Sequence, residues 1–150
     1  PVLGVIDHPI LNERWIGGTG MPATHNGIDV STRPCPDIAE AMLYATTPHM
    51  FEGDDIDAYA RLCGAVKRPQ YGADCYAYGL LASGFVDLVA EATMKPCDYC
   101  ALAPVVEAAG GVITDWNGYP LGLRSDGRVL AAGDAALHAQ ALAILNGEAA

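Results

Sequence analysis

The sequence is poor in positive charge. Its 150 residues hold eight Lys and Arg against eighteen Asp and Glu, which gives a formal net charge of −10. Nucleic acids and anionic membrane surfaces are poor partners for such a protein, so we predict neither a nucleic-acid nor a membrane partner. Any phosphate-bearing ligand would need bound cations to offset the charge of the protein itself.

Long apolar runs are also missing. No stretch is long enough for a membrane span, and the start, PVLGVIDHPILNERW, lacks the basic and then apolar regions of a signal peptide. Hydrophobic residues nevertheless make up 51% of the chain, which is enough to bury a core. Because the first residue is Pro1 and not Met, we expect further sequence upstream.

A disulfide framework is absent as well. The five cysteines are odd in number and irregularly spaced, so we predict reduced thiols and a cytoplasmic protein. Cys97 and Cys100 match the C-x-x-C pattern of redox proteins and zinc sites, but no second ligand pair has comparable spacing. We therefore assign both cysteines to packing and keep the redox or zinc site as the alternative.

The sequence pattern changes near residue 33. Residues 1–33 predict a β-meander with no helices to cover it, so we expect it to continue the sheet of an amino-terminal domain that this chain does not contain. Strand-like and helix-like runs alternate over residues 34–150, which predicts an α/β domain, an α+β layered sandwich. The predicted meander strands span 2–7, 14–18 and 27–31. Later strands are predicted at 41–47, 86–92, 112–116 and 128–133, and helices at 54–66, 75–84, 98–109 and 136–145, the last capped by Asp134.

Three carboxylates stand at successive junctions between elements. Asp74 follows the turn residue Gly72, Glu91 ends an apolar strand, and Asp98 begins a helix. Each has a plain structural alternative: Gly72 forms an ordinary turn, Glu91 is an exposed strand end, and Asp98 is a helix cap. Since binding crevices in α/β folds form at strand ends, the three together predict one cleft.

Residues 84–118, GFVDLVAEATMKPCDYCALAPVVEAAGGVITDWNG, resemble the carboxy-terminal signature of the inositol monophosphatase superfamily. Upstream, YGADCYAYGLLASGFVDLV and TTPHMF resemble its histidinol-phosphate phosphatase branch, and GVIDHPILNERWIGG and HNGIDV resemble strands that follow the first metal motif of the superfamily. The resemblance implies the carboxy-terminal part of an αβαβα fold and a Mg²⁺-dependent phosphatase, commonly a homodimer.

The resemblance also implies roles for single residues. Asp98 corresponds to a Mg²⁺-ligating aspartate, and Glu91 to a glutamate that contacts the non-phosphate part of the substrate. Gly72, Ala73 and Asp74 occupy the loop that lines the substrate pocket. Inositol phosphatases tend to place a small residue at the position of Asp74, so two carboxylates beside the pocket favour a cationic leaving group.

The chain departs from the family pattern in two respects. Cys97 stands where the family often has Trp, and the Gly-Glu-Glu-like and Asp-Pro-x-Asp-Gly-Thr motifs that supply the other metal ligands do not occur. We therefore expect the isolated chain to be inactive and the complete enzyme to hydrolyse histidinol phosphate in histidine biosynthesis. The alternatives are another small phosphate monoester, such as an inositol phosphate, and a non-catalytic subunit that needs an amino-terminal partner.

Overall fold

The first strands form an antiparallel meander. In the computed structural model, which describes residues 1–148, its order is β1-β2-β3-β4. The strands are β1 (Leu3–His8), β2 (Glu13–Gly18), β3 (Met21–His25) and β4 (Ile28–Asp29). The strand predicted at 27–31 is confirmed only as the two residues of β4, and the prediction missed β3, which precedes it. Pro22 hid β3 from sequence reasoning: it cannot donate to the ladder, and the pairing of β2 with β3 is irregular between Ile16 and Gly18.

A second, mixed sheet has the order β6-β5-β7-β9-β8. It comprises β5 (Met42–Ala45), β6 (Arg68–Tyr71), β7 (Leu88–Glu91), β8 (Val112–Thr114) and β9 (Val129–Ala132). Strand β5 runs parallel to β6 and β7, whereas β9 runs antiparallel to β7 and β8. Every residue of β7 and β9 is buried, as their apolar runs predict. Strand β6 contains Pro69, which its position at the edge of the sheet allows.

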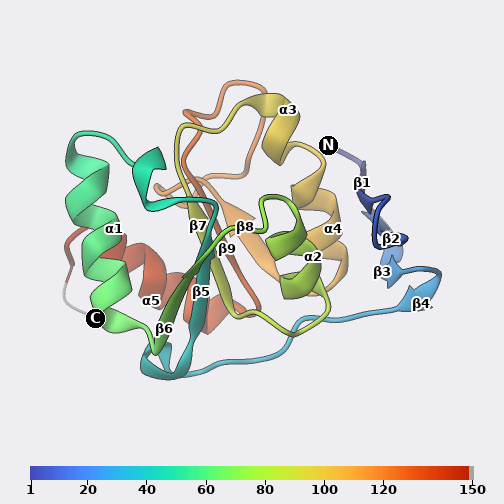
Figure 1. Cartoon of the computed structure of the whole chain (residues 1–150), viewed down its shortest axis with the longest axis horizontal. Coiled ribbons are helices and arrows are strands. Elements are labelled where there is room, and N and C mark those ends of the chain that lie inside the picture. The colour runs from blue at the N-terminus through green and yellow to red at the C-terminus, as the bar shows by residue number, and fades with distance from the viewer. Residues whose placement is uncertain (149–150) are drawn as a thin grey trace.

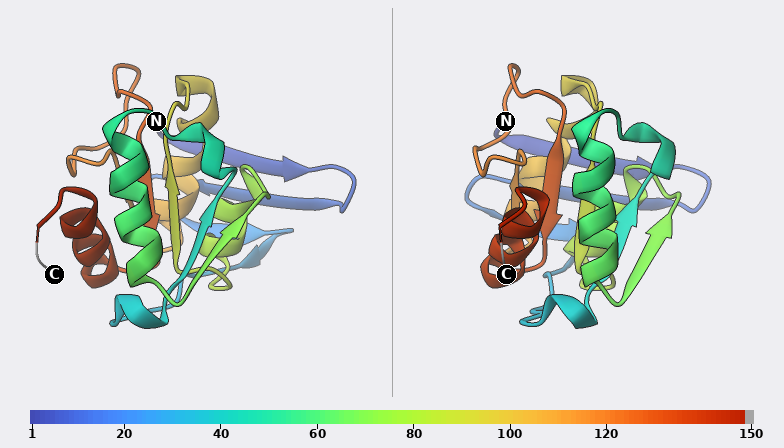
Figure 2. Two further views of the ribbon diagram at one scale, coloured as in Figure 1. Left: turned by 60° about the vertical axis from the view of Figure 1, so that its left-hand side comes forward. Right: turned by 90° about the vertical axis from the view of Figure 1, so that its left-hand side faces the viewer.

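The helices cover both faces of the mixed sheet. On one face lie α1 (Asp54–Ala65) and α5 (Ala135–Leu145), and on the other α2 (Tyr76–Ala82) and α4 (Leu102–Ala108), with the meander sheet outside them (Figures 1 and 2). The short helices are α3 (Pro96–Tyr99), η1 (Ile38–Glu40) and η2 (Pro48–Met50). This αβαβ layering confirms the predicted α/β class, while the domain boundary at residue 33 stays a prediction.

The meander sheet packs closely on α4. A Cβ added at Gly4 would lie 1.9 Å from the carbonyl oxygen of Ala101, and one at Gly17 would lie 2.7 Å from the Cα of Val105. Glycine is therefore required at both positions, because any side chain would push the sheet off the helix. This contact brings the start of β1 beside the turn that joins α3 to α4.

The single helix predicted at 98–109 is wrong, because the structure has two helices there. Helix α3 begins earlier, at Pro96, and Cys100 and Ala101 separate it from α4. Proline is well placed at a first helical position, where its missing N–H has no partner to lose. The predicted cap of the last helix is confirmed: the Asp134 carboxylate accepts the N–H of Leu137 at 2.9 Å.

The core has two halves, one on each face of the mixed sheet. Leu88 and Ala90 of β7 pack toward α1 and α5, whereas Val89 packs toward α2 and α4. Side chains alternate along a strand, so Glu91 shares the face of Val89 and points to the layer that holds α2. Among residues 1–148, no helix combines the length and the apolar character of a membrane span.

Candidate active site

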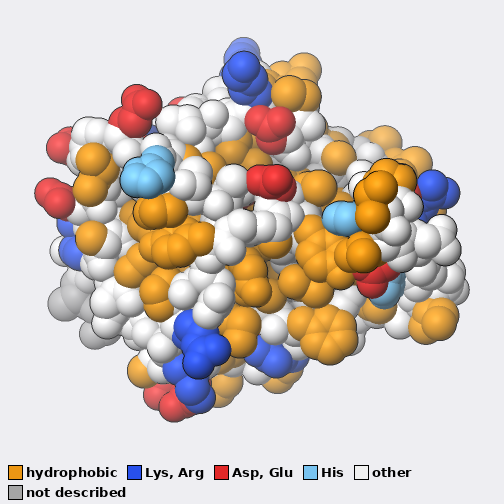
Figure 3. Space-filling view, viewed as in Figure 1, with side chains coloured by type: hydrophobic (Ala, Val, Ile, Leu, Met, Phe, Trp, Pro, Cys, Tyr) orange, Lys and Arg blue, Asp and Glu red, His pale blue; other side chains and the backbone are white. Residues whose placement is uncertain are grey.

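The three predicted carboxylates line one cavity of about 510 Å³. It lies among the ends of β5 and β7, strand β1, the start of α2 and helices α3 and α4. In the region of α3, Figure 3 shows acidic side chains among apolar ones. The fifteen lining residues include no Lys or Arg; they are Val5, Ile6, Asp7, Thr46, Met50, Asp74, Cys75, Glu91, Ala92, Thr93, Met94, Cys97, Asp98, Ala101 and Leu102.

Glu91 is a buried carboxylate at the end of β7. The residue is only 2% exposed, so the alternative of an exposed strand end is wrong. One of its oxygens, Oε1, accepts the backbone N–H of Thr46 at 3.0 Å and also its hydroxyl, and the other, Oε2, accepts the Tyr78 hydroxyl at 2.8 Å. Burial and the charge of Glu91 hold the pKa of Tyr78 well above its usual value, so this tyrosine stays protonated and donates.

Asp74 is presented to the cavity by a strained turn. Gly72, Ala73 and Asp74 have φ angles of 91°, 78° and 45°, three successive residues in the left-handed region. This conformation is free for glycine but costs about 1 kcal/mol or more for each of the other two residues. Asp74 lines the cavity, whereas Gly72 and Ala73 are not among its lining residues and form the turn that places Asp74.

Asp98 has a capping contact and a place on the cavity wall. It is the third residue of α3, and its Oδ2 accepts the backbone N–H of Lys95 at 2.8 Å. Asp98 therefore makes the hydrogen bond to the helix start that the cap alternative predicts, although the capping position itself is held by Lys95. The side chain is exposed and lines the same cavity as Glu91.

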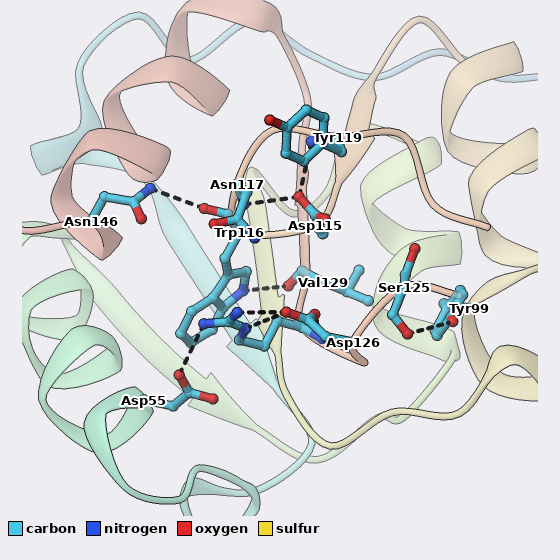
Figure 4. Close-up of polar contacts among 11 residues, drawn as sticks. Asp55, Tyr99, Asp115, Trp116, Asn117, Tyr119, Ser125, Asp126, Val129 and Asn146 are labelled. Carbon is cyan, nitrogen blue, oxygen red and sulfur yellow. Dashed lines mark hydrogen bonds and ion pairs between the residues drawn. The ribbon is translucent and has the colours of Figure 1, made fainter. Parts of the chain in front are cut away.

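The segment between β8 and β9 anchors α3. Tyr99, which is fully buried, donates its hydroxyl to the carbonyl oxygens of Gly122 at 3.0 Å and Ser125 at 3.4 Å. Figure 4 shows the contact with Ser125 and the bonds that fix the rest of the segment, among them Trp116 Nε1 donating to the Val129 carbonyl at 3.1 Å. Sequence reasoning did not anticipate this support, which holds the residue next to Asp98.

The cysteines divide between core and cavity. Cys100 is half-buried and packs against the core as predicted, but the packing assignment of Cys97 is wrong, because Cys97 is exposed and lines the cavity. The helix starts at Pro96, so Cys97 lies on its exposed first turn. Cys75 also lines the cavity, and desolvation together with the charge of Asp74 raises the pKa of its thiol. All five cysteines are free.

The described residues do not form a magnesium site by themselves. Within residues 1–148, no three His, Cys, Asp or Glu side chains are grouped so that they could hold a metal ion. Mg²⁺ requires about six oxygen ligands in near-octahedral geometry, and one carboxylate holds it poorly against water. Asp98 could therefore serve as one ligand of such an ion, but the described residues do not supply the rest of a ligand set.

Sequence reasoning did not single out three polar residues of the cavity wall, Asp7, Thr46 and Thr93. Asp7 is the last exposed residue of β1 and lines the cavity. It forms an ion pair with Arg14, in which Asp7 Oδ1 lies 2.7 Å from Arg14 Nε. Thr46 follows β5 and bonds Glu91. Part of the signal for Thr46 was in the sequence, because Thr46 and Glu91 each follow an apolar strand run, but the pairing of β5 with β7 came from the structure.

The sequence and the fold match known proteins along almost the whole chain. The model of the inositol monophosphatase family matches residues 1–149. "Bifunctional phosphatase IMPL2, chloroplastic" from Arabidopsis thaliana is 52% identical over 149 residues, 95% of this chain and 43% of that protein. A histidinol-phosphatase from Chlorobaculum parvum is 29% identical over 120 residues, 77% of this chain and 45% of that protein.

The solved structures agree with the sequence relatives. An inositol monophosphatase from Zymomonas mobilis superposes with a TM-score of 0.95 at 42% identity, over 97% of this chain and 58% of that one. The chain thus spans about half the length of the relatives that it matches. The match covers the meander, the mixed sheet and the cavity alike, and the chain belongs to the inositol monophosphatase family.

Proposed function

We propose that this chain supplies the substrate-binding side of a metal-dependent phosphatase that hydrolyses L-histidinol phosphate to histidinol, a step of histidine biosynthesis. The observation that carries the proposal is the charge of the cavity. Asp74, Glu91, Asp98 and Asp7 line it, and no Lys or Arg among the described residues does. A cavity of this kind repels a bare phosphate and favours a ligand with a cationic part.

The two ends of the substrate would meet different groups. Histidinol phosphate carries an ammonium group and an imidazole, which suit the carboxylates of Glu91 and Asp74. Its phosphate would need Mg²⁺ ions, which supply the positive field that this chain lacks and activate water for attack on phosphorus. Asp98 would hold one of these ions together with ligands from outside the described residues.

There are two alternatives to a histidinol-phosphate phosphatase: a phosphatase for a neutral polyol ester, and a non-catalytic subunit. A neutral polyol ester, such as an inositol phosphate, is supported by the name of the Zymomonas mobilis relative, and histidinol phosphate by that of the Chlorobaculum parvum relative. A non-catalytic subunit that needs an amino-terminal partner is supported by the incomplete metal site within residues 1–148. A homodimer and a cytoplasmic location remain predictions, the second resting on five free thiols.

The substrate is tested by kinetics. The longest protein that the gene encodes is assayed with Mg²⁺ on histidinol phosphate and on inositol 1-phosphate. We expect a higher kcat/KM for histidinol phosphate; a preference for the inositol ester would refute the substrate assignment and leave the phosphatase assignment standing. Absence of turnover on any phosphate monoester would favour the non-catalytic subunit.

The metal role is tested by Asp98→Asn. The amide keeps the size of the side chain and an oxygen that can accept the Lys95 N–H, but it weakens the metal ligand. Loss of a ligand should lower kcat by about 100-fold or more, because changes even to groups that merely support a metal ligand cost 10- to 100-fold. Turnover near that of the wild type would show that Asp98 is only a helix cap.

A further inference from the structure

Strand pairing brings Thr46 to the side of Glu91. Strands β5 and β7 are parallel neighbours, with Leu43 paired to Leu88 and Tyr44 to Val89. Two residues further along, the same register sets Thr46 beside Glu91. Because side chains alternate along a strand, both point to the face that carries α2. The contact between them is therefore fixed by the sheet itself.

Three donors occupy most of the Glu91 carboxylate. Thr46 contributes its backbone N–H and its hydroxyl to Oε1, and Tyr78 contributes its hydroxyl to Oε2. A carboxylate has about four acceptor positions, so these bonds leave about one free. All three donors are neutral groups, so no cation among residues 1–148 cancels the charge of the carboxylate. The free acceptor belongs to a residue that lines the cavity.

Thr46 also holds the turn that presents Asp74. The N–H of Gly72 donates to the carbonyl oxygen of Thr46 at 3.0 Å and to that of Ala45 at 3.1 Å. One residue therefore bonds the buried carboxylate through its N–H and hydroxyl and the strained turn through its carbonyl. The positions of Glu91 and Asp74 are linked through Thr46.

From this geometry we infer that Thr46 and Tyr78 are positioning residues, which orient Glu91 so that its remaining acceptor receives a hydrogen bond from the non-phosphate part of the substrate. The inference rests on the proposed phosphatase function but not on the choice of ester. It assigns no contact between Thr46 or Tyr78 and the reacting phosphorus. Their loss should weaken ester binding more than it slows the chemical step.

The test compares Thr46→Val with Thr46→Ser in the longest protein that the gene encodes. Valine has nearly the shape of threonine and lacks the hydroxyl, whereas serine keeps it. We expect Thr46→Val to raise KM about tenfold for the ester that the wild type prefers, with kcat changed less than about threefold, because a hydrogen bond to a charged group is lost. Thr46→Ser should restore KM to within about threefold of the wild type.

Inorganic phosphate serves as a probe without the non-phosphate part. Its inhibition constant should stay the same in Thr46→Val, because the phosphate does not reach Glu91 in this account. A parallel rise of KM and of the phosphate inhibition constant would overturn the inference, and so would a KM equal to that of the wild type. Since the ester used is the one that the wild type prefers, a wrong substrate assignment shows in the wild type alone.

Tyr78→Phe is the second variant, with Tyr99→Phe as its matched control. Both tyrosines are fully buried and donate one hydroxyl proton, but Tyr99 donates to backbone carbonyls away from the cavity. We expect both to lower the melting temperature and only Tyr78→Phe to raise KM relative to the phosphate inhibition constant. An equal shift of that ratio in both variants would identify Tyr78 as merely structural.

Discussion

Strand β7 has a buried carboxylate at each end, and the two carboxylates have different hydrogen-bond partners. Asp87, just before the strand, and Glu91, its last residue, are both only 2% exposed. Asp87 receives two bonds from the Arg33 guanidinium, at 2.7 and 2.9 Å, and the N–H of Met42 at 2.9 Å. Glu91 receives its bonds from hydroxyls and a backbone amide alone.

In the proposed function, the difference separates a structural end of the sheet from a substrate-binding end. At the Asp87 end a cation cancels the buried charge, and the pair ties the linker after the meander to the mixed sheet. At the Glu91 end no protein cation among the described residues lines the cavity, and we propose that a cationic part of the substrate pairs with the carboxylate there. Burial of a carboxylate therefore says little about function until its partners are known.

The largest effect of a substitution is expected at the Asp87 end of β7. Arg33→Ala would leave the Asp87 carboxylate buried without its cation, and we expect the free energy of unfolding to fall by about 3 kcal/mol. Urea denaturation followed by circular dichroism measures this. Lys67→Ala is the control, because its ion pair with Glu40 is exposed and should be worth less than about 1 kcal/mol. Equal losses in both variants would contradict the structural role of Asp87.

A smaller effect is expected at Asp134, which lies at the same end of the sheet as Asp87. Its carboxylate accepts the N–H of Cys35 at 2.7 Å and that of Leu137 at 2.9 Å. Burial raises the pKa of Asp134, but these backbone bonds outweigh it and leave the pKa below its usual value. Asp134→Ala should lower the free energy of unfolding at pH 7 by about 1 kcal/mol, the usual worth of a helix cap.

The sign of the pH dependence follows from the lowered pKa. The stabilisation by Asp134 is complete above the unfolded-state value of about 4 and is lost as the pH falls through the lower folded-state pKa. The difference between wild type and Asp134→Ala should therefore shrink when unfolding is measured at decreasing pH below 4. A difference that grows on acidification would contradict the assigned contacts.

The smallest effect is expected at Cys100. It is half-buried and packs against the core, so Cys100→Ala should change the free energy of unfolding by less than about 1 kcal/mol and turnover by less than about threefold. A C-x-x-C redox or zinc centre requires both cysteines, and abolished function in this variant would revive that alternative. The assay is turnover on the preferred ester with and without a thiol reductant.

The sequence predicted what depends on local pattern. The apolar run that ends in Glu91, the cap at Asp134 and the alternation of strands and helices each follow from neighbouring residues. The resemblance to the family predicted Asp98 and Glu91 as site residues, and both line the cavity. It could not say that Glu91 is buried, because burial depends on Thr46 and Tyr78, which come from other elements.

The errors have physical causes too. Strand β3 was not predicted because it contains Pro22, and proline within a run argues against a strand. The helix begins at Pro96 and not at Asp98, so Cys97 lies in its exposed first turn. The support of α3 by Gly122 and Ser125 joins residues more than twenty positions apart. Asp7 reaches the cavity only because Gly4 and Gly17 let the meander pack against α4.

The ester preference of Glu91→Gln tests most directly the claim that this end of β7 binds a cationic ligand. The amide keeps the shape of the side chain and removes its charge, and kcat/KM is measured for histidinol phosphate and inositol 1-phosphate in wild type and variant. We predict that the ratio of the two values falls by about tenfold or more, because a hydrogen bond between charged partners is lost. An unchanged ratio would contradict the account, since Glu91 would then carry no information about the charge of the substrate.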